Sequence, residues 1–406
     1  MALDEPLMGL RALVLGASGM IGAHTTRALL AQGVQVRALV RPGSPARNLE
    51  CLVVERAVGS LEDPASIELA LRGCDLLVHA AAPYPRSHFE AARQTVQAVA
   101  SMRTLLQTAR THVPEELLRL PRSLAPQIAV EQAEGAARVA REQPERAESA
   151  RRAVRAPDLV PPALEGALDA SLHPALADVR GLPGLKRIVY VSSLTTIGRP
   201  LGAGTRLASE SDRFDPATER SPYFRMKAEM EDEARRAANE GLPLVIVNPT
   251  LCIDTWDVTP TTGQLLLAVA HRRLPFGVPG VLNAVATRDV AVGIARALAV
   301  GRTGARYILG GENLSIQELF TRIARAAQVP PPRGQIPLGL LEVAGWGAEA
   351  WNLLARRPWP ALPLSAVRIL RHAQPLDMRR ARRELDLPNT PLDLAIRDAL
   401  AWLRAC

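Results

Sequence analysis

The sequence predicts an α/β fold built on a doubly wound parallel sheet. Short apolar segments alternate with segments of helical periodicity over residues 10–110 and 186–250. Three glycines, at positions 16, 19 and 22, directly follow the first apolar segment. Strands that alternate with helices form parallel sheets through right-handed crossovers. The length of 406 residues and the hydrophobic content of 48% allow a large core and a second, smaller domain.

The expected elements follow one another in the order of such a sheet. We place strands over residues 10–15, 34–40, 52–54, 76–78, 186–192 and 244–247. We place helices over residues 20–32, 64–72, 89–110, 223–239 and 315–327. Asp63 and Pro64 are typical of a helix start, and Ser315 with Glu318 forms a capping box. Gly33 suits the end of the first helix.

Residues 111–184 interrupt this alternation. The segment is rich in Ala, Arg, Glu and Pro and contains no aromatic residue. We interpret it as an insertion in a crossover, because insertions at such places project from the sheet. Residues 128–154 could form a charged helix within it. A surface appendage fits this position, and so does a lid or a partner-binding arm.

Composition and charge argue against several classes of protein. The net charge of +8 either favours an anionic cofactor or substrate or reflects surface arginine, which far outnumbers lysine. No basic tract is interleaved with aromatic residues, which argues against nucleic-acid binding. Cys51, Cys74, Cys252 and Cys406 lack the spacing of a metal site, so we expect reduced thiols and no metal. The sequence has neither an N-terminal signal core nor an apolar run of about 18 residues, so we expect a cytoplasmic protein.

The glycine-rich segment 16–22 lies between the first expected strand and the first expected helix. Glycine lets the backbone bend tightly and approach a pyrophosphate, and the helix N-terminus offers free N–H groups and a positive dipole end. This strand–turn–helix context makes the motif far more specific than its spacing alone. We therefore predict a dinucleotide held by Gly16, Ser18, Gly19, Met20, Ile21 and Gly22.

The end of the second strand indicates which dinucleotide binds. An Asp or Glu there would hydrogen-bond the ribose 2′-hydroxyl of NAD. The sequence has Arg41 instead, and a guanidinium suits the 2′-phosphate of NADP. We therefore predict NADP rather than NAD, with Arg41 as the phosphate ligand. The nearby Arg37 is better interpreted as an exposed strand residue.

Tyr223 and Lys227 form a Tyr-x-x-x-Lys motif on an expected helix, 30 residues after Ser193. Residues four apart share one face of a helix. The lysine ammonium can then lower the pKa of the phenol, whose usual value near 10 makes tyrosine a poor acid or base at neutral pH. In a reductase the phenol would donate a proton to a carbonyl oxygen while a nicotinamide delivers a hydride.

The order of these motifs resembles the extended short-chain dehydrogenase/reductase family (NAD-dependent epimerase/dehydratase family). The resemblance rests on the glycine spacing, the serine-bearing strand 189–193, the Tyr-x-x-x-Lys motif and the turn 248–250 after the sixth strand. Segments 288–291 and 311–315 are similar to later landmarks of the family. The closest branch is that of dihydroflavonol-reductase-like and hopanoid-associated epimerase-like proteins.

The resemblance implies a Rossmann domain and a smaller C-terminal substrate-binding domain. The Rossmann domain spans residues 8–250, interrupted by the insertion 111–184. The substrate-binding domain spans residues 251–406, from which 285–305 return to the Rossmann core. We expect the chain from Tyr307 onward to belong to the smaller domain.

The resemblance also implies the roles of the site residues. Ser193, rather than Ser192, hydrogen-bonds the carbonyl oxygen and stabilises the developing alkoxide. Gln97 stands where the family often has an Asn that holds a proton-relay water, so we place it in the catalytic set with Ser193, Tyr223 and Lys227. The further residues implied to contact the cofactor are Ala80, Ala81, Ala82, Tyr223, Lys227, Asn248, Pro249 and Thr250.

Two C-terminal features concern substrates and partners. Residues 252–255 read Cys-Ile-Asp-Thr where related proteins continue with Gly-Pro, which weakens substrate inference by analogy. The apolar segment 338–354 contains Trp346 and Trp351 and fits a cap over a hydrophobic substrate, a helix on a membrane surface, or ordinary packing. We therefore predict a small-molecule substrate and leave peripheral membrane contact and a homodimer open. The arginines Arg379, Arg380, Arg382 and Arg383 are expected on a solvated helix face.

These observations favour an NADP-dependent oxidoreductase that reduces a carbonyl, or oxidises a secondary alcohol, of a small hydrophobic molecule. One alternative is a nucleotide-sugar epimerase with bound NAD. Leu194 and Thr195 replace the Asp-Glu pair of the related dehydratases, which argues against dehydration. The other alternative is a non-catalytic dinucleotide-sensing or scaffold protein, which Gln97 and the insertion motivate.

Overall fold

The computed structural model describes most of the chain outside the insertion. The described residues are 7–44, 46–83, 88–119, 176–200, 206–216, 221–258, 262–355 and 370–405. The expected charged helix over 128–154 lies outside them. The statements that follow concern these described residues.

A parallel sheet of seven strands forms the centre of the described structure, in the order β3-β2-β1-β4-β5-β6-β9. Its strands are β1 (Arg11–Leu15), β2 (Gln35–Val40), β3 (Glu55–Val58), β4 (Leu76–His79), β5 (Arg187–Val191), β6 (Leu244–Pro249) and β9 (Arg306–Leu309). The strand order reverses between β1 and β4, where open α/β sheets bind ligands at the carboxyl ends of their strands. The predicted doubly wound Rossmann sheet is confirmed.

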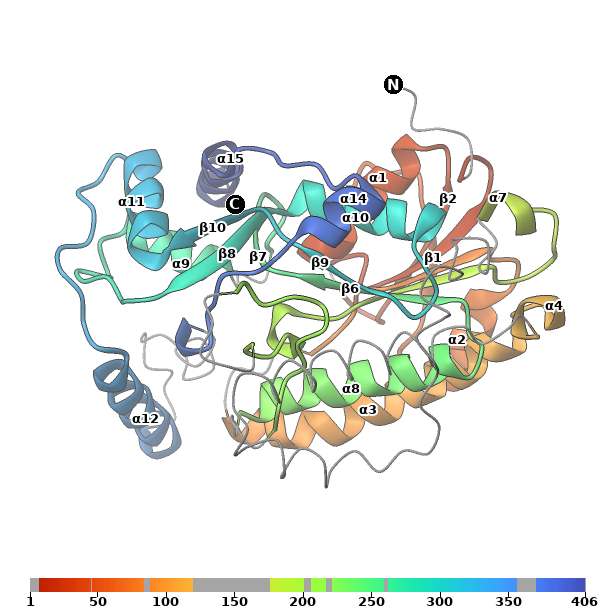
Figure 1. Ribbon diagram of the computed structural model, residues 1–406, viewed down its shortest axis with the longest axis horizontal. Helices are drawn as coiled ribbons and strands as arrows, with labels where there is room; N and C mark the ends of the chain where they lie inside the picture. The colour runs from red at the N-terminus through yellow and green to blue at the C-terminus, as the bar shows by residue number, and fades with distance from the viewer. Residues whose placement is uncertain are drawn as a thin grey trace, which may run out of the picture.

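Helices cover both faces of this sheet (Figure 1). On one face α3 (His88–Thr111) packs against α8 (Pro222–Asn239) and α2 (Pro64–Leu71). On the other face α1 (Met20–Ala31) packs against α10 (Thr287–Val300), which also contacts α14 (Arg379–Leu385). The central strands β1, β4, β5 and β6 are buried almost throughout, as expected of a sheet covered on both sides.

A second sheet, of three strands in the described residues, lies at the other end of the molecule. It consists of β7 (Leu251–Ile253), β8 (Val281–Ala286) and β10 (Glu312–Ser315), and β8 lies in its middle. The helices α9 (Thr262–Ala270), α11 (Ile316–Ala327) and α15 (Leu392–Ala405) pack around it over a separate apolar core. The remaining short helices are α4 (Glu115–Leu118), α7 (Leu176–Val179) and the 3₁₀ turns η1 (Arg47–Leu49) and η4 (Leu194–Thr196).

The predicted helix caps are confirmed. The Asp63 carboxylate accepts a hydrogen bond from the Ala65 N–H, with Pro64 in the first helical turn. The Ser315 hydroxyl accepts one from the Glu318 N–H at 3.0 Å. These side chains satisfy donors that a helix N-terminus leaves without backbone partners.

Two sequence predictions about the sheet were wrong. The third strand is β3 rather than the apolar residues 52–54, and Val53 is 92% exposed. An edge strand that pairs only with β2 can be polar, so hydrophobicity did not mark it. Tyr307 does not begin the smaller domain: it is fully buried in β9, on the edge of the main sheet, where α14 packs on the strand.

The insertion leaves the Rossmann core at one point and returns beside it. The Leu185 N–H donates to the His112 carbonyl at 2.8 Å, so the two ends of the segment are paired by their backbones. Gly184 has a φ of +91°, and a Cβ there would lie 2.4 Å from the same carbonyl oxygen. The residues that follow α3 and precede β5 are therefore held side by side.

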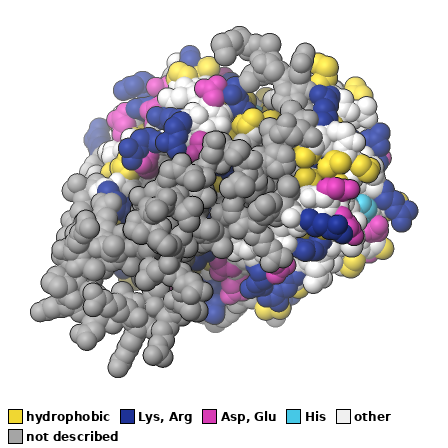
Figure 2. Space-filling model, turned by 45° about the vertical axis from the view of Figure 1, so that its right-hand side comes forward, with side chains coloured by type: hydrophobic (Ala, Val, Ile, Leu, Met, Phe, Trp, Pro, Cys, Tyr) yellow, Lys and Arg dark blue, Asp and Glu magenta, His cyan; other side chains and the backbone are white. Residues whose placement is uncertain are grey.

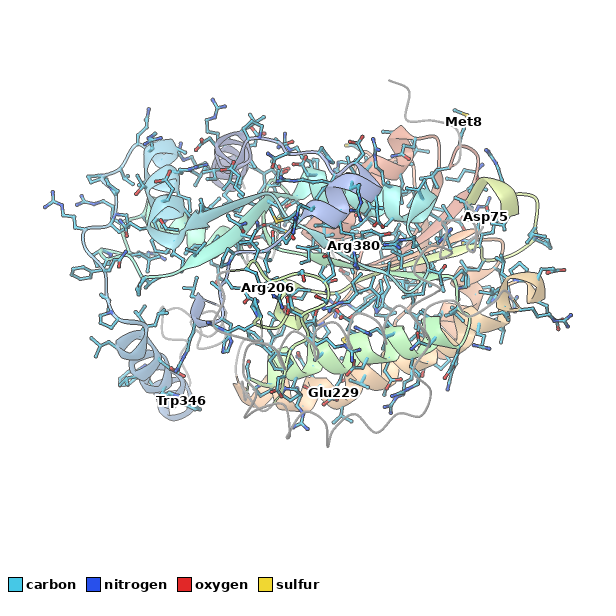
Figure 3. The ribbon with its side chains drawn as sticks, in the orientation of Figure 1. Met8, Asp75, Arg206, Glu229, Trp346 and Arg380 are labelled. Carbon is cyan, nitrogen blue, oxygen red and sulfur yellow. The ribbon has the colours of Figure 1, made fainter. Side chains whose placement is uncertain are left out.

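The apolar segment near the C-terminus forms α12 (Leu338–Ala355), which lies at one end of the molecule (Figures 1 and 3). Leu340, Val343, Trp346 and Trp351 on this helix are exposed. No helix of the described residues is both long and apolar enough to span a membrane. Figure 2 shows Lys and Arg side chains interspersed with Asp and Glu side chains over the described part of one face. The expectation of a solvated arginine cluster agrees with α14, where Arg379, Arg382 and Arg383 are exposed.

Candidate active site

The glycine turn between β1 and α1 is closely packed against the chain around it. Gly16 has a φ of +81°, and a Cβ there would lie 2.7 Å from the Ala81 nitrogen. A Cβ on Gly22 would lie 2.1 Å from the Gly16 carbonyl oxygen. Only glycine fits at both positions. Gly19 is the N-cap of α1 and has no side chain to cap the helix, so the first-turn amides face outward without a side-chain acceptor.

A neighbouring asparagine holds this turn in place, and the sequence did not single it out. The Asn48 amide donates to the Ser18 carbonyl at 2.9 Å and to the Trp256 carbonyl at 2.8 Å. The side chain is buried. It therefore links the glycine turn to the loop that follows β7.

Arg41 and Arg37 have different environments at β2. Arg41 follows the end of the strand and is exposed, and its guanidinium pairs with no side chain among the described residues. Arg37 is buried, contrary to our expectation of an exposed strand residue. Its guanidinium donates to the Ala70 and Arg72 carbonyls, each at 2.7 Å, and lies 2.8 Å from the Glu55 carboxylate. The Arg37 guanidinium is therefore occupied by hydrogen bonds at the end of α2, whereas the Arg41 guanidinium can bind an anion.

The chain after β4 closes the site on the other side of the switch point. The Ala80 N–H donates to the Leu15 carbonyl, which brings Ala80 and Ala81 against the glycine turn. Ala82 is exposed. His79, at the end of β4, is fully enclosed, and burial together with the Lys227 charge lowers its pKa to about 3. It is therefore a neutral ring beside the lysine.

Ser193 lies just beyond the end of β5, and it caps η4. Its hydroxyl oxygen accepts hydrogen bonds from the Thr195 N–H at 3.2 Å and from the Thr195 hydroxyl at 3.0 Å. These bonds leave the Ser193 proton free to donate elsewhere. Ser192 instead donates to the Glu231 carboxylate at 2.5 Å and is buried. The two serines thus have separate environments, and the role of Ser193 in the site remains a prediction.

Tyr223 and Lys227 lie on the buried face of α8, which packs against η4. Burial lowers the pKa of Lys227 to about 8, and the Glu231 carboxylate opposes this effect. Lysine is rare in this chain: of 49 basic residues only Lys186 and Lys227 are lysines. Lys186 pairs with Asp75, so Lys227 is the lysine that lies at the site.

Gln97 does not lie on the buried face of α3 that packs against α8, and its predicted place in the catalytic set remains a prediction. It lies on the exposed side of α3. The face of α3 toward α8 carries Thr95, Ala98, Val99 and Met102, which are buried. Gln97 precedes Ala98 of that buried face by one residue. The alignment of motifs does not determine which residues of α3 point toward α8.

The turn after β6 lies at the same edge of the sheet. Asn248 is fully buried, and its amide donates to the Ser193 carbonyl at 3.2 Å. The Thr250 N–H donates to the Leu309 carbonyl at 3.2 Å, and the buried Thr250 hydroxyl has no partner among the described residues. Pro249 ends the strand between them. Contact of these three residues with the cofactor remains a prediction.

Sequence reasoning missed the buried carboxylate of Glu231. It follows Lys227 by four residues and is 4% exposed. It contacts residues of three different strands or the turns after them. The available indication was the spacing of four that continues Tyr223 and Lys227 along the same helix face.

Asp254 explains the departure of residues 252–255 from the Gly-Pro pattern. Its carboxylate accepts hydrogen bonds from the Arg288 guanidinium at 2.7 and 2.8 Å, and Arg288 also pairs with Asp398 of α15. His24 lies beside it, and burial lowers the pKa of His24 to about 4. This segment therefore joins the second sheet to α10 and α15.

The fold and these residues define an NAD(P)-dependent enzyme with a Rossmann sheet. Residues 16–113 match a family model described as NAD(P)H-binding. A protein of Synechocystis sp. that carries the name dihydroflavonol 4-reductase is 29% identical over 96% of this chain and 94% of its own. Sterol demethylase protein B of Methylococcus capsulatus is 29% identical over 97% of this chain and 98% of its own. The crystal structure of gox2253 has a TM-score of 0.68 and 26% identity, and covers 97% of this chain and 98% of its own.

The chain is thus similar, over nearly its whole length, to NAD(P)-dependent reductases and epimerases of the extended short-chain dehydrogenase/reductase type. Both curated relatives match along nearly their whole length, so the similarity includes the Rossmann sheet and the C-terminal part.

Proposed function

We propose that the protein is an NADP-dependent oxidoreductase that reduces a carbonyl, or oxidises a secondary alcohol, of a small hydrophobic molecule. The observation that carries the proposal is the gathering of Ser193, Tyr223 and Lys227 where η4 packs on α8, at the carboxyl edge of β5. Ligands of open α/β sheets bind at this edge, next to the switch point. The bound nicotinamide would supply or accept the hydride.

In this mechanism each side chain has a separate task. The Ser193 hydroxyl, whose oxygen is fixed by Thr195, donates to the substrate oxygen and stabilises the developing alkoxide. Tyr223 donates the proton that completes the alcohol, and it accepts that proton in the oxidative direction. Lys227 holds a positive charge in a buried setting beside the neutral His79, which favours the phenolate form of Tyr223.

The preference for NADP rests on Arg41. An exposed guanidinium at the end of β2 can donate two parallel hydrogen bonds to a phosphate. The same charge offers nothing specific to the unmodified ribose of NAD. Arg37 contributes no second cation there, because its guanidinium is occupied at α2.

The proposed hydrophobic substrate is supported by the surroundings of Tyr223. The chain has only 3% aromatic residues, yet Phe224 lies edge-on to Tyr223, with ring centroids 6.3 Å apart. Phe214 and His372 pack on Phe224 at 5.7 and 5.2 Å. The two full-length relatives are named for a dihydroflavonol and a sterol, and both of these are polycyclic molecules.

The direct test is NADPH consumption by the purified protein with a panel of aldehydes, cyclic ketones and polycyclic ketones. We expect turnover with at least one apolar ring ketone, and much weaker turnover with NADH. A protein that retains NAD through purification and interconverts nucleotide sugars without net NADPH use would be an epimerase and would overturn the proposal. Tight NADPH binding without turnover of any substrate class would instead favour a dinucleotide sensor.

A further inference from the structure

We propose that Glu231 is a positioning residue of the active site, which ties the Ser193 turn to the helix that carries Tyr223 and Lys227. Its place on α8 comes directly from sequence spacing. Tyr223, Lys227 and Glu231 follow one another at intervals of four residues, so they form one line along the helix. All three side chains are buried.

The Glu231 carboxylate is saturated with donors from the sheet. Its Oε2 atom accepts from the Ser192 hydroxyl at 2.5 Å and from the Asn248 amide at 2.8 Å, and it lies 2.7 Å from the Thr196 hydroxyl. Its Oε1 atom lies 2.9 Å from Nε of Arg306. A buried carboxylate with this many partners is held in one geometry, and the loss of any partner would leave a costly unpaired group.

The same partners hold the backbone of Ser193. The Asn248 amide donates to the Ser193 carbonyl at 3.2 Å, and the Thr196 hydroxyl lies 2.8 Å from that carbonyl oxygen. Arg306 also reaches the Thr196 carbonyl at 3.0 Å. A short chain of contacts thus runs from Glu231 on α8, through Asn248 and Thr196, to the residue that faces the substrate oxygen. The separation of Ser193 from Tyr223 depends on this connection.

The charge of Glu231 has a second effect, on Lys227. The ionisable groups around these two residues are His79 of β4, Tyr190 of β5, Arg306 of β9, and Tyr223 and Arg235 of α8. His79 is neutral, and Arg306 and Arg235 are positive. Glu231 is the anion that offsets the burial of the ammonium and keeps the pKa of Lys227 as high as about 8.

The test uses the fact that the chain has only two lysines. Selective ¹³Cε labelling of lysine gives two resonances, and Lys186→Arg assigns the remaining one to Lys227. In the wild-type protein without cofactor we expect the Lys227 signal to titrate near pH 8. In Glu231→Gln we expect the midpoint to fall by about 1 pH unit or more, because the variant removes the opposite charge that raises the pKa of Lys227.

Glu229→Gln is the matched control. Glu229 lies on the same helix, on its outer side, where it pairs with Arg225 at 3.0 Å (Figure 3). The substitution Glu229→Gln removes one negative charge from α8, as Glu231→Gln does. We expect the titration midpoint of Lys227 and the melting temperature to stay as in the wild type. An equal Lys227 midpoint in the wild type and in Glu231→Gln would overturn the electrostatic part of the proposal.

A second variant separates position from charge and serves if Glu231→Gln does not fold. Thr196→Val removes the hydroxyl that contacts both the Ser193 carbonyl and the Glu231 carboxylate, and it keeps the charge of Glu231. We expect an unchanged Lys227 midpoint, unchanged NADPH affinity and a kcat that falls at least about tenfold with a carbonyl substrate. Wild-type kcat in Thr196→Val would contradict the positioning role. Only this turnover measurement rests on the proposed function; a Lys227 shift without any turnover would contradict the proposed function and leave the charge effect of Glu231 intact.

Discussion

Arg41 and Arg37 illustrate at the scale of single residues how burial decides a role. They lie four positions apart around β2 and have the same side chain. Arg37 is enclosed and hydrogen-bonded to the end of α2, whereas Arg41 projects beyond the strand and is exposed. The proposed preference for NADP over NAD therefore depends on the guanidinium of Arg41 alone.

Replacement of Arg41 by Asp should weaken NADPH binding and spare NADH. Loss of charge-assisted hydrogen bonds costs about 1.5–3 kcal/mol, which corresponds to about 10- to 100-fold in Kd. Fluorescence titration with both cofactors measures the ratio. Arg72→Asp makes the same charge change at another exposed site, at the end of α2, and should leave the ratio alone. An unaltered NADPH/NADH ratio in Arg41→Asp would show that the cofactor assignment is wrong.

Much of the site chemistry could be predicted from residue spacing, and the reason is geometric. Tyr223 and Lys227 had to share a face once α8 was a helix, and Ser193 had to lie at the end of a buried strand. Gln97 and Glu231 show the limit of this reasoning. Whether a helical residue faces its neighbour or solvent depends on how two helices pack, and neither the exposure of Gln97 nor the partners of Glu231 follows from local sequence.

At the scale of elements, close backbone contacts restrict the residues of the β1–α1 turn, where we propose that the cofactor binds. Gly22 lies in the first turn of α1, directly against the carbonyl of Gly16. The backbone of Ala80 and Ala81 closes the other side. Each approach leaves no room for a methyl group, so the turn requires glycine at both positions.

Gly22→Ala should therefore disrupt both stability and cofactor binding. The new Cβ would lie 2.1 Å from the Gly16 oxygen, and overpacking of this kind costs about 1–3 kcal/mol. We expect a lower melting temperature and at least about tenfold weaker NADPH binding. Gly339→Ala is the control, because a Cβ there would meet no atom within 4 Å and alanine favours the helix α12. Wild-type NADPH affinity in Gly22→Ala would argue against this turn as the pyrophosphate site.

Element prediction succeeded where burial produced a pattern and failed at the edges of the sheet. The central strands are continuous apolar segments because both of their faces are covered. The edge strand β3 needs no such pattern, and the apolar residues 52–54 before it lie outside the sheet. The strand β9 was assigned to the wrong part of the molecule, because only the tertiary pairing with β6 shows where it belongs.

At the scale of the whole molecule, two buried histidines couple stability to pH. Burial lowers the pKa of His79 to about 3 and that of His24 to about 4, against 6.5 for an unfolded chain. Between these values the unfolded chain binds protons that the native protein does not. Stability is therefore full above pH 6.5 and declines as the pH falls toward 4.

Each histidine should contribute about 1.4 kcal/mol per pH unit to this decline. Urea unfolding at pH 7, 6 and 5 gives the slope of the free energy of unfolding against pH. In His79→Leu, which keeps an apolar side chain in β4, we expect the slope below pH 6.5 to fall by about that amount. Carboxylates contribute equally to both proteins, so identical slopes would mean that His79 is not held neutral in the native state.

The central claim is that Tyr223 transfers the proton in a hydride reaction with a nicotinamide cofactor. The most direct measurement follows deuterium from [4-²H]NADPH into the product of a carbonyl substrate, for the wild type and for Tyr223→Phe. We expect the wild type to place the label on the carbinol carbon. We expect Tyr223→Phe to lose about 100-fold or more in the rate of label transfer at saturating NADPH. Label transfer by Tyr223→Phe at the wild-type rate would contradict the claim.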